Sequence, residues 1–328
     1  MKYPWHDSAW EALLRKLDRL PQALLLYGPE GIGKLALAEH FVQLLLCEAP
    51  APRSEPCGAC HACRWFLAGH HPDVRFVEPE AIARQPAAAA DEEGGAAPKT
   101  GKASTEIKID QVRELADFLN VGSHRGARRV ALVQPAEDMN LHAANALLKS
   151  LEEPAPGAAF VLVSHRPARL LPTIRSRCVA VPLPLPRRDA ARDWLAAQGV
   201  KESERWLAFA GGAPLRALDY AQGEAGAARV LDALASGDAD ALRACGDREE
   251  LEVLAEALQK AALDRAFAAL AGRTKYATGA KPAGAARGGR WLAFAREMGR
   301  HRALARHPLN PRLFAAEMLA GFAAAGRE

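Results

Sequence analysis

Residues 23–34, with the sequence ALLLYGPEGIGK, decide the fold of this chain of 328 residues. The apolar run at 23–27 is typical of a buried strand, and a periodic apolar pattern typical of a helix follows at 35–46. The glycine-rich turn between them is suited to surround phosphate oxygens with backbone N–H groups and a lysine. We therefore predict a strand, a phosphate loop and a helix. The candidate cofactor-binding residues are Gly28, Gly31, Gly33 and Lys34.

Two groups that a hydrolysing phosphate loop needs are missing. The residue after the lysine should carry a hydroxyl for Mg²⁺, but it is Leu35, which cannot coordinate a hard cation. The strand pattern at 129–133 should end in carboxylates that hold Mg²⁺, but Gln-Pro follows at 134–135 and Glu137 comes too late. Because phosphoryl transfer depends on metal and charge, we predict little or no ATP hydrolysis, and ATP and Mg²⁺ are doubtful cofactors of this chain. Weak nucleotide binding and a vestigial loop both stay open.

The rest of the N-terminal half alternates strands with helices. Compact apolar runs at 130–133 and 160–163 are typical of buried parallel strands. Helical patterns occupy residues 107–119 and 143–151. This alternation predicts an α/β fold, with a parallel sheet covered by helices on both faces.

Four of the six cysteines fall within one short segment. In a reducing compartment such clustering favours metal binding over disulfides. A Cys-x2-Cys-x2-Cys run lets three thiolates face one centre, and the end of the preceding helix supplies a fourth. Tetrahedral zinc takes four such ligands and keeps no open position when its role is structural. We predict a structural zinc held by Cys47, Cys57, Cys60 and Cys63.

Spacing alone leaves other metal sites open. An iron–sulfur cluster also uses closely spaced cysteines. Should Cys47 be a core residue, the spare ligands are His61, His70 and His71. The other cysteines, Cys178 and Cys245, are predicted to be ordinary buried thiols.

The chain divides into three predicted domains and two loops. Residues 79–104 form a low-complexity insertion, predicted to be a mobile surface loop, and a basic glycine-rich stretch at 274–290 is predicted to be a second exposed loop. Prolines keep residues 181–186 extended, as in an interdomain link, and only helical patterns follow. The predicted domains are 1–182, α/β with a cysteine module at 47–63; 183–224, small and helical; and 225–328, larger and helical.

Composition excludes several classes of protein. Hydrophobic residues make up 49% and charged residues 25% of the chain, which excludes a disordered or fibrous protein. No run approaches the ~20 apolar residues of a membrane span, and the N-terminus lacks the apolar core of a signal peptide. We therefore expect a cytoplasmic protein without membrane contact. The net charge of +4 permits nucleic-acid binding but does not argue for it.

Together these features resemble the bacterial clamp-loader subunits of the AAA+ class, most closely their delta-prime family. The resemblance covers most of residues 1–182 and is mainly architectural over 183–328. The features that carry it are Pro4-Trp5, the incomplete phosphate loop, the four clustered cysteines, residues 145–154 (NALLKSLEEP) and residues 171–178 (LPTIRSRC). The phosphate loop alone would be unspecific, but its combination with inserted cysteines and Ser-Arg-Cys is highly specific.

The resemblance implies an AAA+ RecA-like sheet domain with an inserted zinc module, followed by a helical lid and an all-α collar. It also implies that Arg177 is an arginine finger, a catalytic group directed in trans at ATP on a neighbouring subunit. The alternative is that Arg177 only pairs with a local carboxylate. Ser164 and Arg216 match the family's two sensor positions, so Arg216 joins the cofactor-binding candidates.

The implied function is that of a non-hydrolysing subunit in a hetero-oligomeric ring with ATPase subunits and a delta subunit. This ring places the sliding clamp on primed DNA during DNA replication, as a component of the DNA-directed DNA polymerase (nucleotidyltransferase) holoenzyme. The clamp and the DNA would then be partners through the complex.

Two other functions stay open. An active ATPase motor subunit of the same complex is disfavoured by the missing hydroxyl and carboxylates. A zinc-dependent nucleic-acid-binding module would need clustered basic residues, whereas these are scattered, as at Arg125, Arg128, Arg129, Arg187 and Arg188. An apolar stripe on one helix face, which is either internal core or a collar interface, comprises Phe314, Met318 and Phe322.

Overall fold

A computed structural model describes most of the chain: residues 2–50, 52–83, 103–121, 128–223, 226–243, 248–279, 288–304 and 310–327. The chain forms two compact units, Met1–Leu185 and Pro186–Glu328. None of the described helices combines the length with the apolar character that a membrane crossing requires.

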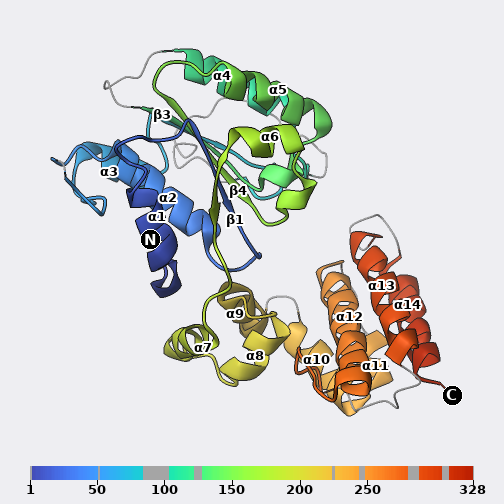
Figure 1. The fold of residues 1–328 in the computed structure, drawn as a ribbon. Helices are drawn as coiled ribbons and strands as arrows, with labels where there is room; N and C mark the ends of the chain where they lie inside the picture. The colour runs from blue at the N-terminus through green and yellow to red at the C-terminus, as the bar shows by residue number, and fades with distance from the viewer. Residues whose placement is uncertain are drawn as a thin grey trace, which may run out of the picture. The chain divides into compact units, whose positions relative to one another are not determined.

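The first unit is a parallel sheet with helices on both faces (Figure 1). Its strands, in the spatial order β2-β3-β4-β1-β5, are β1 (Ala23–Tyr27), β2 (Val74–Val77), β3 (Arg129–Val133), β4 (Ala158–Ser164) and β5 (Val179–Pro182). Its α-helices are α1 (Asp7–Leu14), α2 (Lys34–Leu46), α3 (His61–Leu67), α4 (Ile109–Asn120), α5 (Leu141–Glu152) and α6 (Pro172–Arg177). Three single-turn 3₁₀ helices are Pro4–His6, Ala136–Asp138 and Pro167–Arg169.

The carboxyl ends of the central strands lie at one edge of the sheet. β1 pairs with β4 on one side and with β5 on the other, both in parallel. Tyr27, the last residue of β1, lies opposite Ser164, the last residue of β4, and opposite Pro182, the last residue of β5. The loops after these three strands therefore leave the sheet side by side, where ligands bind in open parallel sheets.

Alternate side chains of the strands build two cores. On one face Leu25 and Phe160 are buried in a cluster with residues of α4, α5 and α6, including Ile174. Leu24 and Leu26 alternate with these residues, so they point to the other face, where α2 packs against β1 and β4. A continuous apolar run such as β1 is therefore buried on both sides, as the sequence predicts.

The sequence predicts three of the five strands and misses two. The predicted strands are confirmed as β1, β3 and β4. β2 has the charged residue Arg75 exposed at its second position, which interrupts the apolar run. β5 runs into the proline-rich stretch at 181–186, which the sequence indicates to be an extended link. The predicted insertion begins and ends at one place, since Ala81 N–H donates to the Ser104 carbonyl at 3.0 Å. Residues 84–102 of that insertion lie outside the described residues.

The second unit is helical. Its helices are α7 (Arg188–Ala197), α8 (Ser203–Phe209), α9 (Pro214–Gln222), α10 (Ala227–Ser236), α11 (Ala239–Arg243), α12 (Arg248–Ala271), α13 (Gly288–Leu304) and α14 (Pro311–Gly326). One cluster of buried residues runs through it from Ala191 to Met318. The division into a lid over 183–224 and a collar over 225–328 stays a prediction.

The apolar stripe of the last helix is internal. Phe314 and Met318 are buried, and the Phe322 ring packs against Trp291 at 5.2 Å between ring centroids. The predicted loop at 274–290 ends earlier than expected because α13 already begins at Gly288. Residues 280–287 of that loop, and Cys245, lie outside the described residues.

Truncation of Phe160 tests the core between the sheet and the helices α4, α5 and α6. Phe160→Ala removes a ring that is 1% exposed, and we expect a loss of about 3–5 kcal/mol in the free energy of unfolding because the packed sheet cannot close the cavity. Leu67→Ala, at a residue that is 67% exposed, is the control and should change little. Urea unfolding of the full chain measures both; equal losses would contradict the assigned core.

Candidate metal centre and phosphate loop

The phosphate loop follows β1 and leads into α2, as the sequence predicts. Gly28 allows a close approach of two chain segments, because a Cβ atom there would lie 2.0 Å from the Leu183 carbonyl oxygen. Gly33 precedes α2 in the left-handed conformation, at φ +81°, which favours glycine. The four predicted loop residues therefore lie in one turn at the carboxyl edge of the sheet.

Lys34 is buried within its own loop. It is 2% exposed, and its Nζ donates a hydrogen bond of 2.5 Å to the Pro29 carbonyl. Burial lowers the pKa of Lys34 to about 8, against the opposing effect of the carboxylates of Glu30 and Glu137. The cation that should meet a phosphate is thus already bonded to the chain.

Glu137 belongs to the same edge, although the sequence places it past the site. One of its carboxylate oxygens accepts hydrogen bonds from the backbone N–H groups of His165 (2.8 Å) and Arg166 (2.9 Å), directly after β4. Its other oxygen and the Ser164 hydroxyl are buried without a hydrogen-bond partner among the described residues. The 3₁₀ turn after β3 brings this carboxylate back toward Lys34, and no sequence pattern marks that return.

The position directly after β3, where an acidic residue is expected, does not carry a carboxylate. Gln134 follows β3 where a metal-binding carboxylate should stand, and it is 8% exposed. Its amide nitrogen donates to Glu78 at 2.9 Å. Leu35 occupies the first turn of α2, where the Mg²⁺-binding hydroxyl should stand.

The N-terminal segment, residues 2–6, packs against the phosphate loop. The indole N–H of Trp5 donates to the Ile32 carbonyl at 2.9 Å, and Nε2 of His6 lies 2.7 Å from the same oxygen. The Tyr3 ring lies directly against Gly33, where a Cβ atom would come within 2.4 Å of it. Sequence reasoning singled out Pro4-Trp5 only as part of a resemblance and did not predict this contact.

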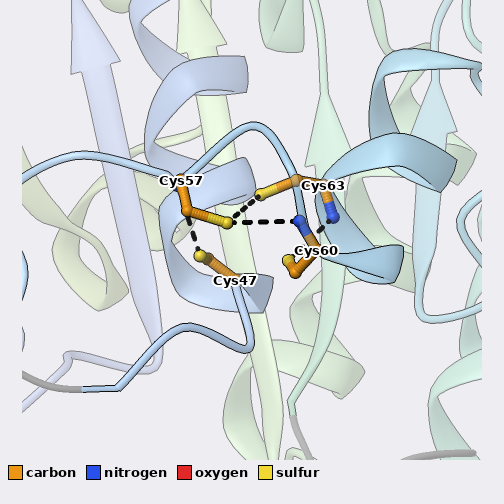
Figure 2. A group of neighbouring side chains, drawn as sticks. All are labelled: Cys47, Cys57, Cys60 and Cys63. Atoms are coloured by element: carbon orange, nitrogen blue, oxygen red, sulfur yellow. Dashed lines mark hydrogen bonds between the residues drawn. The ribbon is translucent and has the colours of Figure 1, made fainter.

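The four predicted cysteines meet at one point. The sulfur atoms of Cys47, Cys57, Cys60 and Cys63 all lie within 4.8 Å of one another (Figure 2). Cys47 follows α2 directly, Cys60 is the N-cap of α3 and Cys63 lies in its first turn, so two helix ends hold the site. The histidines considered as spare ligands, His61, His70 and His71, are not part of this group. Among the described residues, the four cysteines form the cluster that could hold a metal ion.

The spacing of the sulfurs fits a small tetrahedral metal ion. Ligand bonds of 2.3 Å give a tetrahedron with edges of about 3.8 Å, and the sulfurs of Cys57 and Cys63 are 3.9 Å apart. Backbone N–H groups donate to three of the sulfurs at 3.3–3.4 Å, which stabilises thiolates. The cluster can therefore hold a metal ion such as zinc.

The thiol pKa values explain why a cation suits this site. Backbone N–H groups of Cys60 and Ala59 lower the pKa of Cys57 to about 6, whereas burial and the neighbouring thiols raise the pKa of Cys63 to about 12. Four thiolates this close repel one another, and a divalent cation removes that cost. Cys178 lies apart and is half-buried rather than fully buried, and its burial raises its pKa to about 11.

Arg177 ends α6 at the surface. Its guanidinium forms an ion pair of 2.5 Å with Glu152 and donates to the Thr173 carbonyl at 3.1 Å. Its side chain is 36% exposed. Glu152 lies in the 145–154 segment, so the structure brings together two of the stretches on which the resemblance rests.

Arg216 is bonded within the second unit. Its guanidinium pairs with the buried carboxylate of Glu256 and donates to the Tyr220 hydroxyl at 2.6 Å. Lys260 and Arg302 pair with the same carboxylate. A role for Arg216 as a nucleotide sensor stays a prediction.

The first unit is a parallel α/β sheet in which a phosphate loop follows β1 and leads into a helix, as in nucleotide-binding domains. Residues 6–186 match the model of the family described as DNA polymerase III, delta subunit. The chain belongs to this family.

Curated relatives carry the more specific name DNA polymerase III subunit delta-prime. The one from Pseudomonas aeruginosa is 44% identical over 66% of this chain and 60% of its own length. The one from Haemophilus influenzae is 32% identical over 67% and 62%, and the one from Escherichia coli 33% identical over 76% and 71%. The matched part of the chain thus spans less than two thirds of the first two relatives.

The lowered pKa of Lys34 predicts a pH-dependent effect on stability. The unfolded chain keeps this proton up to about pH 10.5 but the folded chain only to about pH 8, so the buried cation opposes folding at pH 7. We expect Lys34→Met to raise the free energy of unfolding at pH 7, on the order of 1–3 kcal/mol. The gain should shrink between pH 8 and 10.5. A pH-independent difference in urea unfolding would contradict the assignment.

Proposed function

We propose that this chain is a delta-prime-type subunit of a DNA polymerase III clamp loader, and that it does not hydrolyse ATP itself. Its Arg177 contacts ATP held by a neighbouring ATPase subunit and thereby supports the loading of a sliding clamp on primed DNA. Its partners are the ATPase subunits and the delta subunit of a hetero-oligomeric ring, with the clamp and the DNA reached through that ring. Family membership and the exposed Arg177 support this proposal.

The surface position of Arg177 is the observation that carries the role in trans. An exposed ion pair such as that with Glu152 contributes only about 0–1 kcal/mol. A triphosphate from outside offers more negative charge and a geometry that the planar guanidinium can bind with two hydrogen bonds. Arg177 can therefore leave Glu152 at little cost when a neighbour presents ATP.

The chemistry of the chain's own loop supports the absence of hydrolysis. Leu35 offers no oxygen to Mg²⁺, and Gln134 is a neutral amide already bonded to Glu78. Lys34 bonds to the loop backbone, and the carboxylate of Glu137 acts on it through its charge. A phosphate entering the loop would meet a cation whose pKa is low and whose hydrogen bond must first break.

The metal is proposed to be zinc with a structural role. Four thiolates leave no coordination position for water or substrate, so the group does no chemistry. The ion would join the end of α2 to the start of α3 and so fix a protrusion on the first unit.

Removal of the guanidinium tests the finger. In a complex reconstituted with its ATPase subunits, Arg177→Ala should leave assembly intact and lower DNA-stimulated ATP turnover at the adjacent site by roughly 10³-fold or more. Arg175→Ala, two residues away on the same exposed helix, is the matched control and should keep full turnover. Unchanged turnover in Arg177→Ala would exclude the proposed role.

Metal content tests the cysteine site. Elemental analysis of the chain purified without chelators should find about one zinc per chain, because one closed four-ligand site holds one ion. Cys57→Ser should lose most of that zinc, whereas Cys178→Ser, outside the cluster, should retain it. Wild-type protein without zinc would refute the site.

A further inference from the structure

The loop that presents Cys57 is anchored to the rest of the first unit by a small set of contacts. We call residues 52–57 the Cys57 loop. The indole N–H of Trp10, in α1, donates to the Ser54 carbonyl at 3.1 Å. His40, in α2, hydrogen-bonds to one oxygen of the Glu55 carboxylate at 2.5 Å. These contacts fix the loop to two helices that pack on the sheet.

The other oxygen of Glu55 connects the Cys57 loop to the N-terminal segment. Lys2 Nζ lies 3.1 Å from Glu55 and 3.3 Å from Asp7, and it also lies over the Trp10 ring. Lys2 directly precedes Tyr3, whose ring lies against Gly33 of the phosphate loop. A continuous set of contacts therefore leads from the cysteine cluster to the phosphate loop.

The N-terminal segment has a defined structure where it meets the phosphate loop. Tyr3 N–H donates to Nδ1 of His6 at 3.3 Å, so the ring's proton lies on Nε2, which donates to the Ile32 carbonyl. The rings of Tyr3 and Trp5 stack at 5.0 Å between centroids, nearly parallel. The ion pairs of Lys2 therefore hold a segment that has a defined structure of its own.

We propose that metal bound by the four cysteines orders the N-terminal segment against the phosphate loop, with Glu55 as the connecting residue. This inference rests on the proposed metal site. A metal ion fixes Cys57, and Glu55 is only two residues away, so its carboxylate is held in place before it meets Lys2 and His40. Exposed ion pairs are weak largely because both side chains must be immobilised. A carboxylate that is already fixed gives a stronger pair.

The coupling is reciprocal. If metal binding favours the ordered N-terminal segment, the ordered segment must favour metal binding by the same factor. Glu55 is then a positioning residue for the metal, which it does not touch. Its substitution should weaken metal affinity without changing the number of ions bound at saturation.

Hydrogen exchange on the full chain tests this coupling, with zinc as the probe. Amide exchange is compared between zinc-loaded protein and protein stripped by a chelator, at Tyr3 and His6 and across β4 as a reference. We expect stripping to speed exchange at Tyr3 and His6 at least threefold and to leave β4 unchanged. Glu55→Gln should show the fast exchange even with zinc bound and should no longer respond to stripping. Glu11→Gln, an exposed carboxylate of α1 outside this network, is the matched control and should behave as wild type.

A competition titration of zinc against a chromophoric chelator provides the second measurement. Glu55→Gln should bind zinc at least threefold more weakly with unchanged stoichiometry. Wild-type protein that binds no zinc would refute the proposed metal site. Zinc that binds normally while stripping leaves Tyr3 and His6 unchanged would overturn the coupling alone. A rise in exchange that extends through β4 would also overturn it, since the metal would then support the whole unit.

Discussion

The parallel pairing of β1 with β4 and β5 is the constraint on which the candidate sites of the first unit depend. It places the carboxyl ends of these strands at one edge, so that Tyr27, Ser164 and Pro182 lie side by side. The approach is so close at Gly28 that a Cβ atom would collide with the Leu183 carbonyl. The phosphate loop and Glu137 therefore both lie at this edge.

Three of the polar groups at this edge are bonded to the chain itself. Lys34 bonds to the loop, Gln134 bonds to Glu78, and Glu137 holds the backbone after β4. This edge has the phosphate loop of a nucleotide-binding domain, but Leu35 and Gln134 stand where the oxygens that hold Mg²⁺ are expected. Arg177, the last residue of α6, lies at the surface instead, and we propose that it acts on ATP bound by a neighbouring subunit.

The sequence predicts the structural features that depend on a local pattern of residues. It does not predict contacts between residues that lie far apart along the chain. The strand at 23–27 and the cysteine cluster were predictable because burial on both faces gives an apolar run and a metal needs closely spaced thiolates. The edge strand at Val179–Pro182 was not, because it is short and continues into the proline-rich stretch at 181–186, which indicates an extended link. Glu137 and Tyr3 reach the phosphate loop only through the folded backbone, across sequence distances at which no pattern operates.

We propose that this chain has the fold of a phosphate loop but does not hydrolyse ATP. The most direct test measures phosphate release from Mg·ATP by the purified full chain alone, beside Lys34→Ala. We expect both proteins to release phosphate at the rate of buffer. Release by the wild type that disappears in Lys34→Ala would contradict the claim, because the loop would then hydrolyse ATP without help.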